Sequence, residues 1–191
     1  MQPMQVDKKM KTLLLMRHGK SSWKQPDLAD HERPLAKRGL RDSHRMGEMI
    51  FERELVPQTI LSSSAVRALE TARVFSEACG ATVPVLSLDS LYLSEADVYF
   101  NELRALPDTL ERIMVIGHNP GFESLLQILA DRAESLPTAV VAYLVLPLES
   151  WADLNAKTKG NLVEIWRPKE IRWVDEDKEE KKKSKKKKKD K

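Results

Sequence analysis

Cysteine is nearly absent from this sequence, since only Cys79 occurs among its 191 residues. A lone cysteine cannot form an intrachain disulfide, which fits a reducing compartment. Cys79 also continues an apolar stripe at helical spacing with Ala72 and Phe75. We therefore expect a buried structural thiol and not a nucleophile.

Long hydrophobic runs are missing as well. The longest run, from Ala139 to Leu146, falls well short of the roughly 18–20 apolar residues that span a bilayer. Near the N-terminus, Arg17 interrupts the apolar run Leu13–Met16, whereas a secretory signal needs about 7–15 apolar residues. We expect a soluble, cytoplasmic protein without a signal peptide.

Glycine is scarce, with seven residues, and the sequence contains neither a Gly-rich P-loop nor a dinucleotide fingerprint. Those motifs use glycines to let the backbone approach phosphate groups closely. The sequence therefore predicts no nucleotide cofactor, and we expect none of another kind.

The net charge of +3 comes from the C-terminal tail. Residues 175–191 hold ten Lys and six acidic residues, whereas residues 1–174 carry 22 basic and 23 acidic residues. The tail has no apolar side chain to bury, so we expect it to be disordered. We expect a flexible N-terminus over residues 1–10 and one folded domain over residues 11–170.

Short apolar runs alternate with amphipathic segments, a pattern typical of a mostly parallel sheet covered by helices on both faces. It predicts an α/β three-layer sandwich with about six strands, near residues 11–16, 58–62, 82–86, 112–116, 139–146 and 161–166. Besides the helix that carries Cys79, three helices are expected between them. The first carries a stripe of Leu40, Gly47, Ile50, Phe51 and Leu55, and the second runs from about Ala96 to Leu106 with Tyr99, Phe100, Leu103 and Leu106 facing inward. The third carries Phe122, Leu125, Leu126 and Leu129.

Two histidines stand directly behind apolar runs. Arg17-His18-Gly19 follows residues 13–16, and Gly117-His118-Asn119-Pro120 follows residues 113–116. Between them, residues 62–72 form a third strand-to-helix junction with Arg67 in the first helical turn. Reactive groups of open α/β sheets gather beyond the carboxyl ends of the strands. We expect these two histidines and two arginines to face one pocket.

This combination suits the transfer of a phosphoryl group through a histidine, which needs a nitrogen nucleophile and fixed positive charge around three oxygens. We expect His18 to attack phosphorus, because neutral imidazole is a competent nucleophile at pH 7. Arg17 and Arg67 would supply planar, permanently charged donors, and His118 a hydrogen bond to an equatorial oxygen. Further candidate phosphate ligands are the Gly19 backbone and Asn119. The stretch 30–33 is expected to shape the rim of the pocket.

Metal ligation is the other chemistry that two histidines could support. The sequence has no carboxylate or thiolate at ligand spacing from them, and the neighbouring guanidinium groups would repel a cation. We therefore expect no metal site.

These motifs resemble those of the histidine phosphatase superfamily, which has the phosphoglycerate-mutase-like fold. The resemblance rests on residues 17–19, the Ser-Ser-x-Ala-x-Arg-Ala-x-x-Thr-Ala block at 62–72, and residues 117–121, and it covers about residues 10–170. The wording of residues 17–23, 30–35 and 37–39 is similar to the SixA-type phosphohistidine phosphatases. Lys20, where many members have glutamate, also favours that branch. The resemblance implies that His18 accepts the phosphate, that Arg17 and Arg67 bind it, and that His118 completes the pocket.

The general acid is the open role. Superfamily phosphomonoesterases usually place an acidic residue between the second and third motifs, where this sequence has Asp89, Glu95 and Asp97. Ser94 followed by Asp97 favours a capping box at a helix start instead. An imidazole leaving group, with a conjugate-acid pKa near 6.5 against roughly 16 for water or an alcohol, needs far less proton donation.

The sequence thus favours a metal-independent phosphatase that acts on phosphohistidine in a protein. One alternative is a phosphomonoesterase for a small phosphorylated metabolite, with Asp89, Glu95 or Asp97 as acid. Another is an anion- or RNA-binding protein that works through its tail. The ten tail lysines would allow weak, salt-sensitive contact with acidic partners, but without interleaved aromatic residues they offer no base readout. No membrane partner is expected.

Overall fold

A computed structural model of the chain describes residues 10–80, 82–171 and 173. Within them, six strands form one sheet in the order β3-β2-β4-β1-β5-β6. In chain order the strands are β1 Lys11–Arg17, β2 Thr59–Ser63, β3 Val85–Leu88, β4 Arg112–Gly117, β5 Val141–Leu146 and β6 Asn161–Trp166.

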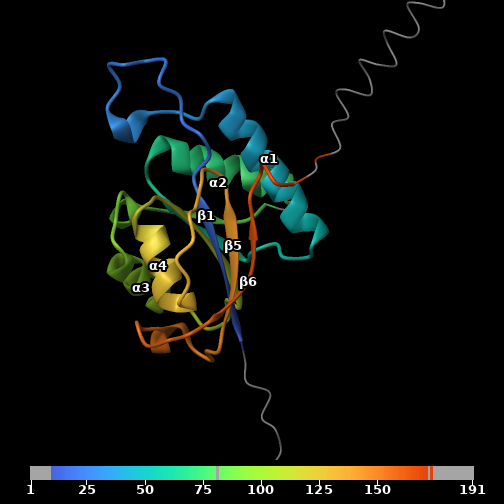
Figure 1. The fold of residues 1–191 in the computed structure, drawn as a ribbon, viewed down its shortest axis with the longest axis vertical. Helices are drawn as coiled ribbons and strands as arrows, with labels where there is room; N and C mark the ends of the chain where they lie inside the picture. The colour runs from blue at the N-terminus through green and yellow to red at the C-terminus, as the bar shows by residue number, and fades with distance from the viewer. Residues whose placement is uncertain (1–9, 81, 172, 174–191) are drawn as a thin grey trace, which may run out of the picture.

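Helices cover both faces of this sheet, with α1 and α2 on one side and α3 and α4 on the other (Figure 1). They are α1 Lys37–Glu52, α2 Val66–Ala78, α3 Ala96–Arg104 and α4 Gly121–Ala130. Short 3-10 turns lie at Asp30–Glu32, Asp89–Leu91 and Trp151–Asp153. The predicted three-layer α/β sandwich is confirmed.

The two cores follow from the alternation of side chains along the central strand. On β1, Leu13 and Leu15 point into the core beneath α3 and α4, whereas Leu14 and Met16 point into the core beneath α1 and α2. Because both faces of a central strand are covered, such strands form continuous apolar runs. This is why the strand ends, where polar residues begin, stand out in the sequence.

The sheet is mixed, which corrects the prediction of a mostly parallel sheet. Strand β5 pairs antiparallel with both of its neighbours, β1 and β6, whereas β1, β2, β3 and β4 pair in parallel. The cause is the segment between α4 and β5. It contains no strand and returns the chain to the edge where β1 ends, so that the backbone N–H of Ala139 donates to the carbonyls of Arg17 and His18.

Several predicted details also change. The third strand begins three residues later than predicted, at Val85. On α1, Leu40 and Phe51 are exposed, and the buried face includes Ser43 and Met46 instead. The predicted capping box is wrong, because Glu95 is the N-cap of α3 and no side chain caps this helix.

Other expectations about burial hold. Tyr99, Phe100 and Leu103 of α3 point into the core as predicted. Cys79 is fully buried, and burial raises the pKa of its thiol to about 12. This confirms the prediction of a structural thiol and excludes a thiolate at neutral pH.

The predicted disordered tail, residues 175–191, lies outside the described residues, as does all of the predicted flexible N-terminus except Met10. Among the helices of the described part, none has the length and apolar character that a membrane crossing requires.

Candidate active site

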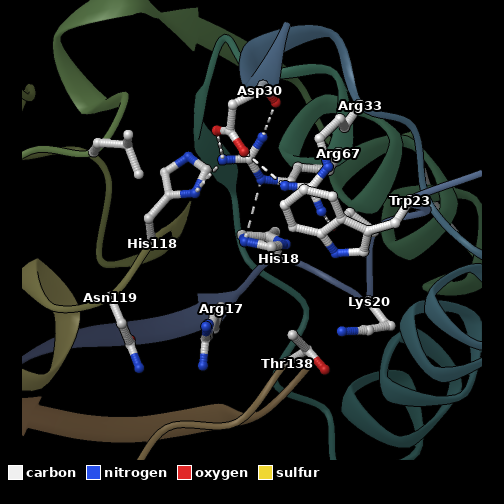
Figure 2. Close-up of a pocket in the computed structure, with 12 residues that line it drawn as sticks. Arg17, His18, Lys20, Trp23, Asp30, Arg33, Arg67, His118, Asn119 and Thr138 are labelled. Carbon is white, nitrogen blue, oxygen red and sulfur yellow. Dashed lines mark hydrogen bonds and ion pairs between the residues drawn. The ribbon is translucent and has the colours of Figure 1, made fainter. Parts of the chain in front are cut away.

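The predicted motifs meet in one pocket beyond the carboxyl ends of the strands (Figure 2). His18 follows β1, Arg67 lies in the first turn of α2 behind β2, and His118 follows β4. The cavity has a volume of about 370 Å³. Its lining residues are Arg17, His18, Lys20, Ser21, Trp23, Asp30, Arg33, Arg67, Leu93, His118, Asn119 and Thr138.

Two contacts fix the tautomer of His18. Its Nδ1 lies 2.7 Å from the carbonyl oxygen of Gly19, and its Nε2 lies 3.3 Å from Nε of Arg67. A guanidinium only donates and a carbonyl only accepts. Nδ1 therefore carries the proton, and the lone pair of Nε2 is directed into the site.

Both pocket histidines are held neutral. Burial lowers the pKa of His18 to about 4. The hydrogen bond to the Gly19 carbonyl raises this pKa, but the charges of Arg67, Arg17 and Arg33 lower it further. Burial lowers the pKa of His118 to about 3, with further contributions from His18 and Arg67. At neutral pH the site therefore holds two neutral imidazoles among permanent cations.

Arg67 links the two histidines. Besides the contact with His18, its Nη2 lies 3.5 Å from Nδ1 of His118, and the two imidazole centroids are 4.9 Å apart. Arg67 is only 3% exposed. Its buried guanidinium is tied to Asp30, where Nη2 lies 2.9 Å from Oδ2 and Nη1 donates to the backbone carbonyl. The guanidinium plane is thereby fixed at the centre of the site.

The other ring nitrogen of His118 contacts a serine of the second motif, residues 62–72. Its Nε2 lies 2.8 Å from Oγ of Ser63. Because Nδ1 accepts from Arg67, Nε2 carries the proton and donates to this hydroxyl. The ring of Tyr92 meets the His118 ring edge-on, with centroids 5.7 Å apart.

The stretch 30–33 does more than shape the rim, because Asp30 organises two of the pocket arginines. Its carboxylate pairs with Arg33 at 2.6 Å and with Arg67 at 2.9 Å, and the hydroxyl of Tyr92 donates to it. Partial burial raises the pKa of Asp30, but the hydrogen bonds from Tyr92 and Arg33 and the charge of Arg67 outweigh this and lower it below its usual value. Sequence reasoning missed this role, since charge spacing within a loop does not reveal a partner on another element.

Arg17 and Asn119 form the wall of the pocket that lies opposite Asp30 and Arg33 (Figure 2). Nη1 of Arg17 and Nδ2 of Asn119 both donate to the carbonyl of Leu136, at 2.8 and 3.0 Å. Glu123 anchors the same segment by accepting from Asn119 and from the Leu136 amide. Two buried atoms, Nε of Arg17 and Oδ1 of Asn119, have no hydrogen-bond partner among the described residues.

Gly19 lies where the chain packs against α1 and α2. Its N–H donates to Oγ1 of Thr71 at 2.9 Å, and the residue does not line the cavity. A Cβ at this position would lie 2.9 Å from the carbonyl oxygen of Gly39 on α1. Glycine is therefore required for the close approach of α1, and its amide is already occupied.

The three acidic candidates lie elsewhere. Asp89, Glu95 and Asp97 are all exposed, and none lines the cavity. Asp30 is the one carboxylate among the lining residues. In the described ranges, no group of three or more His, Cys, Asp or Glu side chains is placed to hold a metal ion.

Known protein sequences resemble this chain over most of its length. Residues 13–93 match the model of the histidine phosphatase superfamily (branch 1). An uncharacterised chloroplastic protein of Arabidopsis thaliana is 31% identical over 155 residues, which are 75% of this chain and 70% of that protein. An uncharacterised protein of Mycobacterium tuberculosis strain H37Rv is 31% identical over 152 residues, 73% of this chain and 92% of that protein.

Solved structures with this fold include SixA from Nakamurella multipartitia, with a TM-score of 0.71 and 25% identity over 83% of this chain and 96% of that one. The protein histidine phosphatase SixA complexed with tungstate also has a TM-score of 0.71, at 19% identity over 84% and 99% of the two chains. A mycobacterial glucosyl-3-phosphoglycerate phosphatase has a TM-score of 0.60 at 15% identity, over 81% and 97%. The last two likenesses concern the fold alone.

Proposed function

The chain belongs to the histidine phosphatase superfamily and is a phosphatase, and from this premise we propose that it removes the phosphoryl group from phosphohistidine in a protein, with His18 as nucleophile. The observation that carries this proposal is the chemical make-up of the pocket: a neutral imidazole nucleophile, several fixed cations and, among the described lining residues, no carboxyl group poised to donate a proton.

The first step is attack of the Nε2 lone pair of His18 on phosphorus. A bond forms between Nε2 and phosphorus while the bond from phosphorus to the substrate nitrogen breaks, and the leaving imidazole takes a proton from solvent. The proton on Nδ1, donated to the Gly19 carbonyl, stabilises the positive charge that develops on the ring. In the second step water attacks phosphorus, the bond from phosphorus to Nε2 breaks, the proton lost by water passes to solvent, and phosphate leaves with the Nε2 lone pair restored.

Positive charge around the phosphoryl oxygens would come from Arg17, Arg33, Arg67 and Lys20, which all line the cavity. The Nε–H of Arg17 that lacks a described partner would be satisfied by a phosphoryl oxygen. The incoming negative charge would also raise the pKa of His118, whose Nδ1 could then gain a proton and donate to the same group. These side chains supply the electrostatic stabilisation without a metal ion.

No carboxyl group of the described lining is poised to donate a proton, and this favours a nitrogen leaving group. Asp30 is kept ionised by Tyr92, Arg33 and Arg67, so it cannot donate a proton at neutral pH. A monoester would release an alkoxide, which depends strongly on a general acid, whereas imidazole leaves with little help. Likeness to SixA from Nakamurella multipartitia supports the same choice.

The deciding experiment compares three substrate classes in the presence of EDTA: a phosphohistidine peptide, p-nitrophenyl phosphate and a panel of sugar phosphates. We expect the phosphohistidine peptide to have the highest kcat/KM by at least about tenfold. A sugar phosphate with the highest kcat/KM would reject the proposal in favour of a metabolite phosphatase. Loss of all activity in EDTA would reject the metal-independent mechanism.

A further inference from the structure

Two exposed apolar side chains stand at the edge of the otherwise polar pocket. Trp23 is 70% exposed, the highest value among the large hydrophobic side chains that the structure describes, and Leu93 is 53% exposed. Both line the cavity that contains His18 and Arg67. Exposed apolar surface next to a catalytic site is a feature of ligand-binding grooves.

Trp23 is held in place from one side. The guanidinium of Arg33 lies over its ring, 3.3 Å from the centroid. Arg33 is itself buried and fixed by the carboxylate of Asp30, the hydroxyl of Ser21 and the carbonyl of Ser22. The indole therefore rests on an anchored cation (Figure 2), and most of its remaining surface is open to solvent.

Leu93 is held by an unusual backbone. Its φ angle is +49°, in the left-handed region that a branched side chain seldom adopts. The two residues before it point elsewhere: Leu91 is buried in the core, and the hydroxyl of Tyr92 donates to Asp30. The strained conformation places an apolar side chain at the pocket rim and not in the core, and such strain is concentrated at functional sites.

The direction of the reaction tells which part of a substrate would meet these side chains. A phosphoryl group transfers with the attacking and leaving atoms roughly in line. When Nε2 of His18 attacks from the floor of the pocket, the leaving group must point away from it, toward the mouth. Trp23 and Leu93 carry no charge there, and their one polar group is the indole N–H of Trp23, so they offer contact mainly to the apolar faces of a leaving group. A planar aromatic ring gains stacking and apolar contact.

We propose that Trp23 and Leu93 form a leaving-group subsite that receives the imidazole ring of phosphohistidine, with Trp23 as the stacking surface and Leu93 as a second wall. This inference rests on the proposed function and adds the residues that select its substrate.

The test compares two substrates with the same scissile bond type. Phosphohistidine and phosphoramidate both contain a P–N bond, but only the first has a ring. We expect Trp23→Ala to raise KM for phosphohistidine about five- to tenfold, the size of an aromatic contact, and to change KM for phosphoramidate less than about twofold. Trp23→Phe should restore most of the loss. Leu93→Asn, which tolerates the left-handed backbone, should show a smaller loss with the same selectivity.

Phe51→Ala is the matched control, since Phe51 is 54% exposed on α1 and does not line the cavity. It should leave both substrates unchanged. An equal rise in KM for both substrates in Trp23→Ala would mean that the indole only supports Arg33, and no rise for either would mean that it contacts nothing. Both results overturn the subsite.

A binding measurement separates this inference from the proposed function. Phenylphosphonate and methylphosphonate are compared as competitive inhibitors of p-nitrophenyl phosphate hydrolysis. Selective weakening of phenylphosphonate in Trp23→Ala supports an aromatic subsite even if phosphohistidine proves not to be the substrate, in which case only the imidazole assignment fails. Equal weakening of both inhibitors rejects the subsite whichever substrate is hydrolysed.

Discussion

Arg67 donates its Nε–H to Nε2 of His18 across 3.3 Å. This is the unprotonated nitrogen of the ring, because the proton is held on Nδ1 by the Gly19 carbonyl. The contact places a permanent cation beside the lone pair that would attack phosphorus. A phosphoryl group approaching Nε2 would exchange this hydrogen bond for one between Arg67 and its own oxygen. The proposed nucleophile and the proposed source of positive charge would thus be aligned before the substrate arrives.

Replacing His18 with Ala should abolish turnover, because the proposed route passes through a covalent bond to its Nε2. Rapid quenching of the wild type during hydrolysis of a labelled substrate should trap phosphate on His18 in acid-labile, base-stable form. His44→Ala is the control, since His44 is exposed on α1 and pairs with Glu48. Turnover without label on any histidine would refute the covalent mechanism.

Arg67→Lys should preserve the fold but lower turnover by of the order of 10²-fold, because the charge remains while the planar, two-sided geometry is lost. Arg73→Lys on the same helix alters only an exposed ion pair with Glu77 and should have little effect. Steady-state kinetics with circular dichroism on both variants provides the check. A near-wild-type rate in folded Arg67→Lys would remove this residue from the site.

The neutral histidines predict a specific pH dependence of stability. Their pKa values are about 4 and 3 in the folded protein and about 6.5 when unfolded, so the unfolded state binds more protons at acidic pH. Their contribution is fully present above pH 6.5, falls progressively as the pH drops below this value, and is lost once the pH has passed through about 4 for His18 and about 3 for His118. Urea unfolding between pH 7 and pH 4 should therefore show a decline that is smaller in the doubly substituted His18→Asn, His118→Asn protein. An identical decline in both proteins would contradict the depressed pKa values.

Asp89→Asn, Glu95→Gln and Asp97→Asn should each change phosphohistidine hydrolysis by less than about tenfold, because none of these side chains lines the cavity. Loss of a true general acid costs roughly 10²–10⁴ in rate. Kinetics on phosphohistidine and p-nitrophenyl phosphate test this directly. Collapse of phosphohistidine turnover in one folded variant with unchanged phosphate affinity would identify a general acid and favour the monoesterase alternative.

Truncation after Val174 should leave hydrolysis of phosphoramidate unchanged, since the lining residues of the cavity lie between Arg17 and Thr138. The removed lysines should matter only for salt-sensitive association with acidic partners. Matched assays of both chain lengths at low and high salt make the comparison. A large loss of phosphoramidate activity would show that the tail contributes to the pocket.

The sequence by itself determined the layers of the fold and the meeting of His18, Arg67 and His118. Each of the three follows an apolar strand, and strand ends of a parallel sheet gather at one edge, so one-dimensional position sufficed. The burial of Cys79 could be predicted as well, because the residue continues an apolar stripe at helical spacing. These features depend on local periodicity and on one general rule of topology.

Only the tertiary structure decided the rest. The reversal of β5 depends on where the segment 131–140 returns, and the pairing of Asp30 with Arg67 joins a loop to a helix 37 positions along the chain. The tautomer of His18 depends on which donor faces Nε2, and Gly19 is explained by the approach of α1. Charge pairing, tautomer and steric closeness are set by distances of a few ångströms between distant parts of the chain, and sequence spacing carries no information about those distances.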